Sequence, residues 1–284
     1  MPKEHFHLYL ADEFLKNCAA GLSHSGVADR LSFFIGAVSP DIFFYDFPSF
    51  SLSPLGDALH DLMDPKRLSI VGDWIESRRK YAGGPGKSRL PLPGVASAWA
   101  LGLTCHFLAD AAWHPVIDQL SASIDYCAEK RLSSMECHRL IESELEALRL
   151  AGSRAPERYT RLLKDLRGKE RLFEIASLYR ELIEFTGLGP VPAEKRIVAC
   201  FLSQNFFLRL FANATLGRIR DRMLDLPFMR YVGSLVIPSR PILPPLFATA
   251  LPPDGNPFSD LFREQALTLL KVQLPALAKR LSTN

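Results

Sequence analysis

The chain contains 284 residues, of which 48% are hydrophobic and 23% are charged. These proportions are typical of globular proteins and exclude a disordered or collagen-like chain. The formal net charge is +3, and no run of five or more like charges indicates a nucleic-acid-binding arm. No repeat and no sharp shift in composition divides the sequence, so we expect a single helical domain over residues 1–284.

Apolar residues recur at helical spacing through the first part of the chain. This spacing predicts helices at residues 8–22, 26–36, 55–63 and 65–81. The Gly- and Pro-rich residues 83–94 form a predicted loop.

A cluster of aromatic residues follows Asp41, between the second and third of these helices. It consists of Phe43, Phe44, Tyr45, Phe47 and Phe50. Such side chains can contact lipid, and they can also stack on nucleic-acid bases. Packing in the hydrophobic core is a third explanation, and the sequence leaves all three open.

Residues 95–114 are apolar on nearly every face, which predicts a helix that is buried all round. Pro115 restricts the conformation of the residue before it, so we expect this helix to end at His114. The sequence shows no uninterrupted apolar run of 18 residues and no signal-peptide pattern after Met1. We therefore expect a cytoplasmic protein without a transmembrane helix, and peripheral contact with a membrane stays open.

Helical patterns continue in the second half of the chain. Ser133 and Glu136 match a capping box, which predicts a helix that runs to about residue 150, and Pro156 is placed to open the next helix. Later helices are expected to end at Gly168, Gly187 and Gly217. Residues 238–257 hold seven of the 21 prolines, which predicts a long loop before a last helix at residues 259–281.

Strand-like alternation is almost absent from the sequence, so the predicted fold class is all-α, a compact multi-helix bundle. No motif assigns a role to residues 150–284. The chain has an odd number of cysteines without CxxC spacing, and most lie in apolar, helix-like runs. They are Cys18, Cys105, Cys127, Cys137 and Cys200. We expect reduced thiols that pack as small hydrophobic residues.

The histidines carry the clearest functional signal. The chain has seven histidines, and random placement of the 31 Asp and Glu residues would put an acid four residues after roughly one of them. Four histidines have such a partner: His60 with Asp64, His106 with Asp110, His114 with Asp118, and His138 with Glu142. On a helix, residues four apart share a face, so each pair can present a nitrogen and an oxygen to one point.

The strongest case is the series His106, Asp110 and His114, which forms one polar stripe on the most apolar predicted helix. A buried carboxylate without a partner costs several kcal/mol, so this stripe needs a counterpart. A metal ion would supply it, and a buried Asp–His hydrogen bond between helices is the alternative. For Asp64 and Asp118 we weigh two roles, orienting His60 and His114 by hydrogen bonds or remaining plain surface charges.

Enough candidate ligands are present for two or three metal ions. They are His7, Asp41, His60, His106, Asp110, His114, His138 and Glu142, with His5 as a further candidate. A mixture of imidazole and carboxylate ligands suits zinc, manganese or iron. Two metal ions held close together can stabilise both the attacking and the leaving oxygen of a phosphoryl transfer.

The order of these motifs resembles the zinc-dependent phospholipase C family. This family is related to single-strand-specific nucleases and to the N-terminal part of glycosylphosphatidylinositol-specific phospholipase D. The resemblance lies in an N-terminal His, a Pro-Asp-Ile, a lone His, HxxxD, His and HxxxE. Here these are His7, Pro40–Ile42, His60, His106–Asp110, His114 and His138–Glu142, together with the surrounding phrases at residues 34–42 and 101–110. The resemblance covers about residues 5–146.

The resemblance implies a compact helical bundle and a set of zinc ligands. Asp41, His60, His106 and Asp110 would hold one zinc ion, and His114, His138 and Glu142 a second. Asp110 would bridge to a third ion that His7 helps to bind. Asp41 would also be the candidate base toward the attacking water. The implied substrate is a phospholipid or another phosphodiester.

The chain departs from the secreted members of the family in three respects. Those members complete the third site with an N-terminal Trp, whereas this chain begins with Met1, and His5 is the candidate substitute. The step from Asp110 to His114 is shorter than in the secreted phospholipases, and the export signal is missing. Our prediction is a metal-dependent phosphodiester hydrolase of the phospholipase C type. A single-strand-nuclease-like phosphodiesterase, which the weak net charge disfavours, and a non-catalytic helical metal-binding protein are the alternatives.

Overall fold

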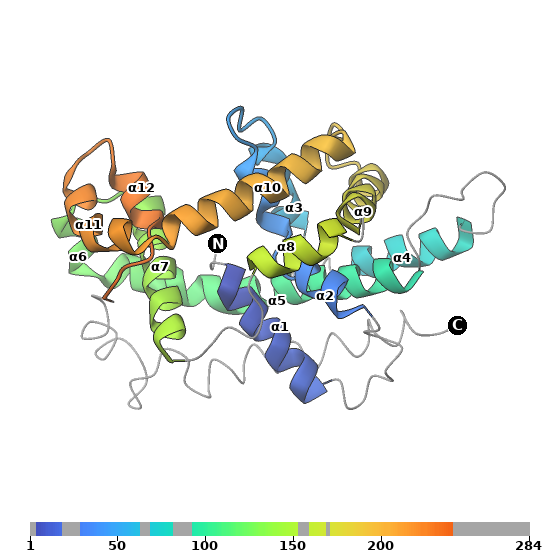
Figure 1. The fold of residues 1–284 in the computed structure, drawn as a ribbon, viewed down its shortest axis with the longest axis horizontal. Coiled ribbons are helices and arrows are strands. Elements are labelled where there is room, and N and C mark those ends of the chain that lie inside the picture. Colours follow the sequence, from blue (N-terminus) through green and yellow to red (C-terminus); the bar gives the residue numbers. More distant parts are fainter. Residues whose placement is uncertain are drawn as a thin grey trace.

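The computed structural model describes residues 4–18, 29–62, 69–81, 93–152, 159–168 and 171–240 (Figure 1). These residues form twelve α-helices and one 3-10 helix, and no strand occurs among them, so the all-α prediction is confirmed. The loop expected at residues 83–94 is wrong for its last two residues, which begin α5. Its residues 83–92, the helix start at Pro156, the Pro-rich residues 241–257 and the last helix at residues 259–281 lie outside the described residues.

The first half of the chain supplies short helices and one long one. They are α1 (Glu4–Cys18), α2 (Arg30–Gly36), η1 (Pro40–Tyr45, the 3-10 helix), α3 (Ser53–Leu62), α4 (Ser69–Tyr81), α5 (Pro93–Ser123) and α6 (Asp125–Glu129). The second half supplies α7 (Ser134–Gly152), α8 (Tyr159–Gly168), α9 (Arg171–Thr186), α10 (Glu194–Phe211), α11 (Ala214–Asp225) and α12 (Arg230–Leu235).

Helix α5 is the element around which the others pack. It contacts α1, α2, α4, α7 and α9, and Figure 1 shows it extending along much of the long axis of the molecule. Its apolar residues up to Leu108 belong to a large hydrophobic core shared with the helices α1 to α4 and α8 to α10. From Ala109 onward they belong to a second core shared with α6 and α7. The helix therefore passes from one core into the other near its middle.

The expected end of this helix at His114 is wrong, because α5 continues through Pro115 to Ser123. A proline inside a helix removes one backbone hydrogen bond and costs about 3 kcal/mol. The residues beyond it offset this cost, since Ile117 and Leu120 are buried in the second core. Tertiary packing thus outweighs the local preference of the sequence.

The predicted helix boundaries in the second half are partly confirmed. The amide of Ser133 donates to Glu136 and the amide of Glu136 donates back to the hydroxyl of Ser133, so the capping box is present. Helix α8 ends at Gly168, and Gly187 follows α9 with a φ of 66°, a left-handed conformation that favours glycine. Gly217 was expected to end a helix and instead lies within α11, because the side chain of Asn213 caps the start of that helix.

The expectation of reduced cysteines is wrong for one pair. Cys127 of α6 and Cys137 of α7 form a disulfide, and their Cα atoms lie 5.6 Å apart. The short turn between α6 and α7 places the two side chains opposite each other, which sequence spacing alone did not indicate. Cys105 and Cys200 form no disulfide and are buried, as expected, and the side chain of Cys18 lies outside the described residues.

One described helix is long and apolar enough to cross a membrane, namely residues 94–122 within α5. In its apolar window 88% of the residues are buried inside the fold, which is typical of a core helix. The pair α10 and α11 passes the same test only as one broken span bent by 79°. Neither feature amounts to a clear transmembrane segment.

Two glycines allow α2 and α5 to cross in direct backbone contact. A Cβ atom on Gly36 would overlap the carbonyl oxygen of Trp99, and one on Gly102 would overlap the carbonyl oxygen of Phe33 and lie 2.9 Å from the amide of Ala37. Backbone atoms cannot move aside as the end of a flexible side chain can. The close crossing therefore requires glycine at both positions.

We expect Gly102→Ala to lower the free energy of unfolding by about 1–3 kcal/mol or more, because the methyl group forces α2 and α5 apart. Gly94→Ala is the matched control, since a Cβ there meets no atom within 4 Å and alanine is the better helix former. Chemical denaturation of both variants measures the difference. Equal stability of the two variants would contradict the close crossing.

The disulfide gives a second expectation. Peptide mapping of the unreduced protein should recover the peptides of Cys127 and Cys137 joined to each other, and Cys137→Ser should lower the free energy of unfolding by about 2–4 kcal/mol. Alkylation of both thiols in unreduced, denatured protein would show that the bond does not form.

Candidate metal centre

The polar stripe on α5 lies at the point where the helix passes between the two cores. Its central residue, Asp110, is almost fully buried. Its Oδ2 atom lies 3.1 Å from Nε2 of His106, and its Oδ1 atom lies 3.6 Å from Nε2 of His114. One carboxylate therefore faces both histidines of the stripe, one turn before and one turn after it.

Asp41 and His60 approach the same carboxylate from two other elements. Asp41 lies in the first turn of η1 and is fully buried, and His60 lies in the last turn of α3. Nε2 of His60 is 3.2 Å from Oδ1 of Asp41 and 3.7 Å from Oδ2 of Asp110. Nε2 of His106 lies 4.0 Å from the same Oδ1 of Asp41.

Helix α1 completes this side of the cluster with His7. Its Nε2 atom lies 3.4 Å from Oδ1 of Asp110. The imidazole rings of His7 and His106 stack with their centroids 3.9 Å apart. His5 lies two residues before His7 in the same helix, but its side chain is outside the described residues.

A second group forms where α7 faces the later part of α5. Nε2 of His138 lies 3.1 Å from Oε1 of Glu142, and the rings of His138 and His114 are 5.4 Å apart between centroids. Asp118 is an exposed surface charge, as one of the two interpretations held, but it lies 3.0 Å from Nδ1 of His138 and so orients that residue rather than His114. Asp64 lies outside the described residues.

Backbone carbonyls fix the direction of two of the histidines. Nδ1 of His60 lies 2.8 Å from the carbonyl oxygen of Gly56, and Nδ1 of His106 lies 3.0 Å from that of Ala37. A carbonyl oxygen only accepts, so each Nδ1 carries a proton and each Nε2 is directed toward the cluster. Metal-binding histidines are commonly oriented in this way.

The structure thus brings the predicted site residues together in three groups of potential ligands, whose ligand atoms lie within 4.8 Å of one another in each group. The groups are His7, His106 and Asp110; Asp41, His60 and His106; and His114, His138 and Glu142. Each combines imidazole nitrogen with carboxylate oxygen, a donor set that suits zinc. Proximity does not by itself establish that a given residue binds a metal, so each residue's role stays a prediction.

The electrostatics of the cluster keep its two central carboxylates ionised. Burial raises the pKa of Asp41 and of Asp110, but attraction to His106 and to neighbouring histidines outweighs burial and holds both pKa values below the usual range. Burial lowers the pKa of His60, yet the carboxylate of Asp41, 3.2 Å from its Nε2, and that of Asp110 raise that pKa to about 9. Burial and repulsion from His106 lower the pKa of His7 to about 3, so that imidazole is neutral.

Several buried polar atoms of the cluster have no hydrogen-bond partner among the described residues. They are both carboxylate oxygens of Asp41 and of Asp110, and Nε2 of His60, His106 and His114. Unpartnered buried oxygens and nitrogens are costly, and here they all converge on one region. A cation at their centre would satisfy them together, so the residues present fit a metal centre.

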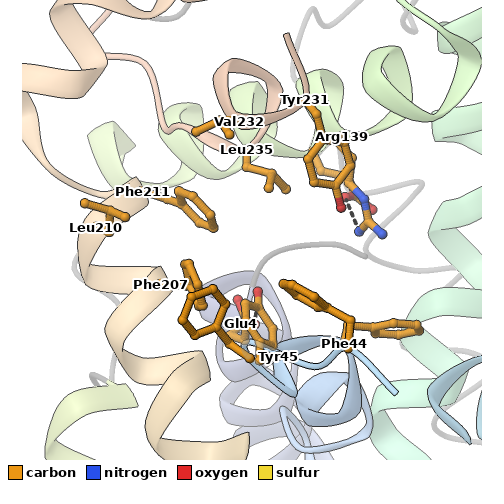
Figure 2. Close-up of a pocket in the computed structure, with 13 residues that line it drawn as sticks. Glu4, Phe44, Tyr45, Arg139, Phe207, Leu210, Phe211, Tyr231, Val232 and Leu235 are labelled. Carbon is orange, nitrogen blue, oxygen red and sulfur yellow. Dashed lines mark hydrogen bonds and ion pairs between the residues drawn. The ribbon is translucent and has the colours of Figure 1, made fainter. Parts of the chain in front are cut away.

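An apolar cavity adjoins the cluster. Its volume is about 400 Å³, and it lies between η1, α7, α10 and α12 (Figure 2). Among its lining residues are Glu142 of the second group and Phe44, whose ring lies 5.6 Å from that of His60. The cavity and the histidine–carboxylate cluster therefore share a wall.

This cavity also settles the position of the aromatic cluster after Asp41. Phe43 is fully buried in the large core, whereas Phe44, Tyr45, Phe47 and Phe50 line the cavity. Core packing thus explains only the first of these residues.

Two charged residues of the cavity wall escaped the sequence analysis. Glu4 is buried and accepts hydrogen bonds from the hydroxyl of Tyr45 and the amide of Gln204. Arg139 lies 3.5 Å from Glu142, and the i,i+3 spacing of these two residues on one helix was the available signal.

An all-helical protein with clustered, buried histidines and carboxylates belongs to the class of candidate metalloproteins. The comparison with protein families is more specific: the family model of zinc-dependent phospholipase C matches residues 6–183, more than half of the chain. The chain therefore belongs to the zinc-dependent phospholipase C family. The match extends beyond residue 146 through most of α9. No curated protein and no solved structure matches the chain.

We expect protein purified without chelator or metal-affinity resin to contain two or more ions of zinc, manganese or iron per chain. Because the ions neutralise buried carboxylates, their removal should lower the free energy of unfolding by about 4 kcal/mol for an ion present at a thousand times its Kd. Elemental analysis and denaturation with and without chelator measure both effects. A metal content near zero that added ions do not restore would mean that the histidines have a structural role.

Proposed function

We propose that this protein is a zinc-dependent phosphodiester hydrolase of the phospholipase C type. One observation carries the proposal: ionised carboxylates and histidine nitrogens without hydrogen-bond partners converge beside an apolar cavity. The first feature suits a metal-activated hydrolytic site, and the second suits a substrate with a lipid part. Membership of the family supports both.

In this proposal the three groups hold two or three ions. Asp41, His60, His106 and Asp110 hold one zinc ion, and His114, His138 and Glu142 hold a second. His7 and Asp110 contribute to a third, with His5 as a further candidate. Manganese or iron can replace zinc at ligands of this kind.

Bound ions at these positions supply two effects, a lower pKa for a nearby water molecule and neutralisation of charge on the phosphate. The remaining work falls to the chain. Asp41, fixed in η1 beside His60, orients the attacking water and accepts its proton. Arg139 adds a guanidinium group at the edge of the second group, where it can bind a phosphate oxygen.

The cavity favours a phospholipid over a nucleic acid. A nuclease needs a basic groove along the phosphate backbone, and the net charge of the whole chain is only +3. Among the charged residues lining the cavity, Glu4 and Glu142 oppose the single Arg139. A single-strand-nuclease-like activity and a non-catalytic metal-binding role therefore rank below lipid hydrolysis.

The cytoplasmic location and peripheral membrane contact remain predictions. The disulfide between Cys127 and Cys137 argues against the cytoplasm, since disulfides persist chiefly in oxidising compartments. Cell fractionation of the untagged protein distinguishes a cytoplasmic location from an oxidising compartment.

We expect Asp110→Ala to remove bound metal and phosphodiesterase activity together, with an activity loss of more than about 100-fold, because this carboxylate faces four histidines. Asp165→Ala, which removes an exposed carboxylate from α8, is the control and should change neither quantity. The measurements are elemental analysis and hydrolysis of a phospholipid and of a chromogenic phosphodiester. Full hydrolysis by Asp110→Ala with metal retained would overturn the mechanism.

A further inference from the structure

The cavity beside the metal centre has an apolar part and a polar part. Phenylalanine and leucine side chains of η1, α10 and α12 form most of its surface, among them Phe207, Phe211 and Leu235. Figure 2 shows Arg139 and Tyr231 together on one side of the cavity, away from Leu210 and Phe211. Glu142 lies next to Arg139, so the polar side is the one that adjoins the second ligand group.

The cavity opens to solvent between residues that both line it and remain exposed. The exposed fractions are 58% for Phe47, 50% for Phe50, 38% for Leu210 and 48% for Tyr231. Large apolar side chains exposed around the entrance of an apolar cavity are typical of a binding site. Their ligand must present an apolar surface to them.

The loop that carries two of these aromatic residues is fixed in position. Asp46 accepts hydrogen bonds from the guanidinium of Arg196, from the hydroxyl of Ser49 and from the amide of Leu52. These contacts hold the polar side of the loop against α10. Phe47 and Phe50 are therefore presented at the entrance by a preformed loop, which reduces the entropy lost on binding.

We infer that this cavity binds one acyl chain of the substrate and directs the attached phosphate toward the metal centre. A ligand that fills it needs a long apolar part and an anionic group at one end, which matches the apolar lining and the guanidinium of Arg139 beside Glu142. A volume of about 400 Å³ is large enough for a single chain. The inference rests on the proposed function for the nature of the attached group, whereas the binding of a chain can be tested alone.

The test uses monoacylglycerols of increasing chain length, which carry one chain and no phosphodiester, so catalysis does not interfere. Their Kd values are measured by titration calorimetry below the concentration at which they form micelles. Burial of each further methylene should tighten binding to the native protein by about fourfold, until the chain fills the cavity and the Kd levels off.

Two variants should change, in opposite directions, the chain length at which the Kd levels off. Val232→Trp fills part of the cavity and should make the Kd level off at a shorter chain, whereas Leu235→Ala enlarges the cavity and should extend the range. Ile219→Trp adds the same indole to an exposed position of α11 that does not line the cavity, and it should behave as the native protein does. Metal content and melting temperature confirm that each variant is folded.

If the Kd does not depend on chain length, or if it depends on chain length identically in the native protein and all three variants, the acyl-chain site is refuted. Hydrolysis of phosphodiesters by the native protein is measured separately. Chain-dependent binding without any hydrolysis would retain the site and refute the proposed function. Hydrolysis without chain-dependent binding would support the proposed function and refute the acyl-chain site.

Discussion

The structure depends on the burial of two ionised carboxylates, Asp41 and Asp110, at the boundary between two hydrophobic cores. Neither charge could remain there without positive charge nearby, because the desolvation of an unpaired carboxylate costs several kcal/mol. Helices α1, α3 and α5 bring histidines to these carboxylates, of which Asp41 comes from η1, and the arrangement of the four elements around one point follows from that requirement. The same concentration of negative charge makes the point attractive to a divalent cation.

The packing of α2 against α5 connects the fold to this requirement. Gly36 and Gly102 let the two helices touch through their backbones, and the carbonyl of Ala37, the residue after α2, then reaches Nδ1 of His106 on α5. The close crossing of α2 and α5 thereby determines the orientation of the His106 ring. This explains how two residues without side chains contribute to the geometry of the site.

The sequence was sufficient to predict the fold class and the residues that converge, and it failed where tertiary contacts decide. The i,i+4 pairs on α5 and α7 are local, so spacing revealed them. The continuation of α5 through Pro115, the disulfide and the hydrogen bond from His138 to Asp118 all depend on where a neighbouring helix lies. The cavity could not be predicted either, since its walls come from segments more than 150 residues apart, as Phe44 and Phe207 illustrate.

The place of the cluster between two cores has a consequence for folding cooperativity. The larger core surrounds the first part of α5 and the smaller one its later part, and the polar stripe of His106, Asp110 and His114 lies across the boundary between them. The desolvation of the buried carboxylates opposes compaction at this junction, and a bound cation would offset that cost. Metal binding would therefore join the two cores into one cooperative unit, and the chain without metal would melt in two steps where the loaded protein melts in one.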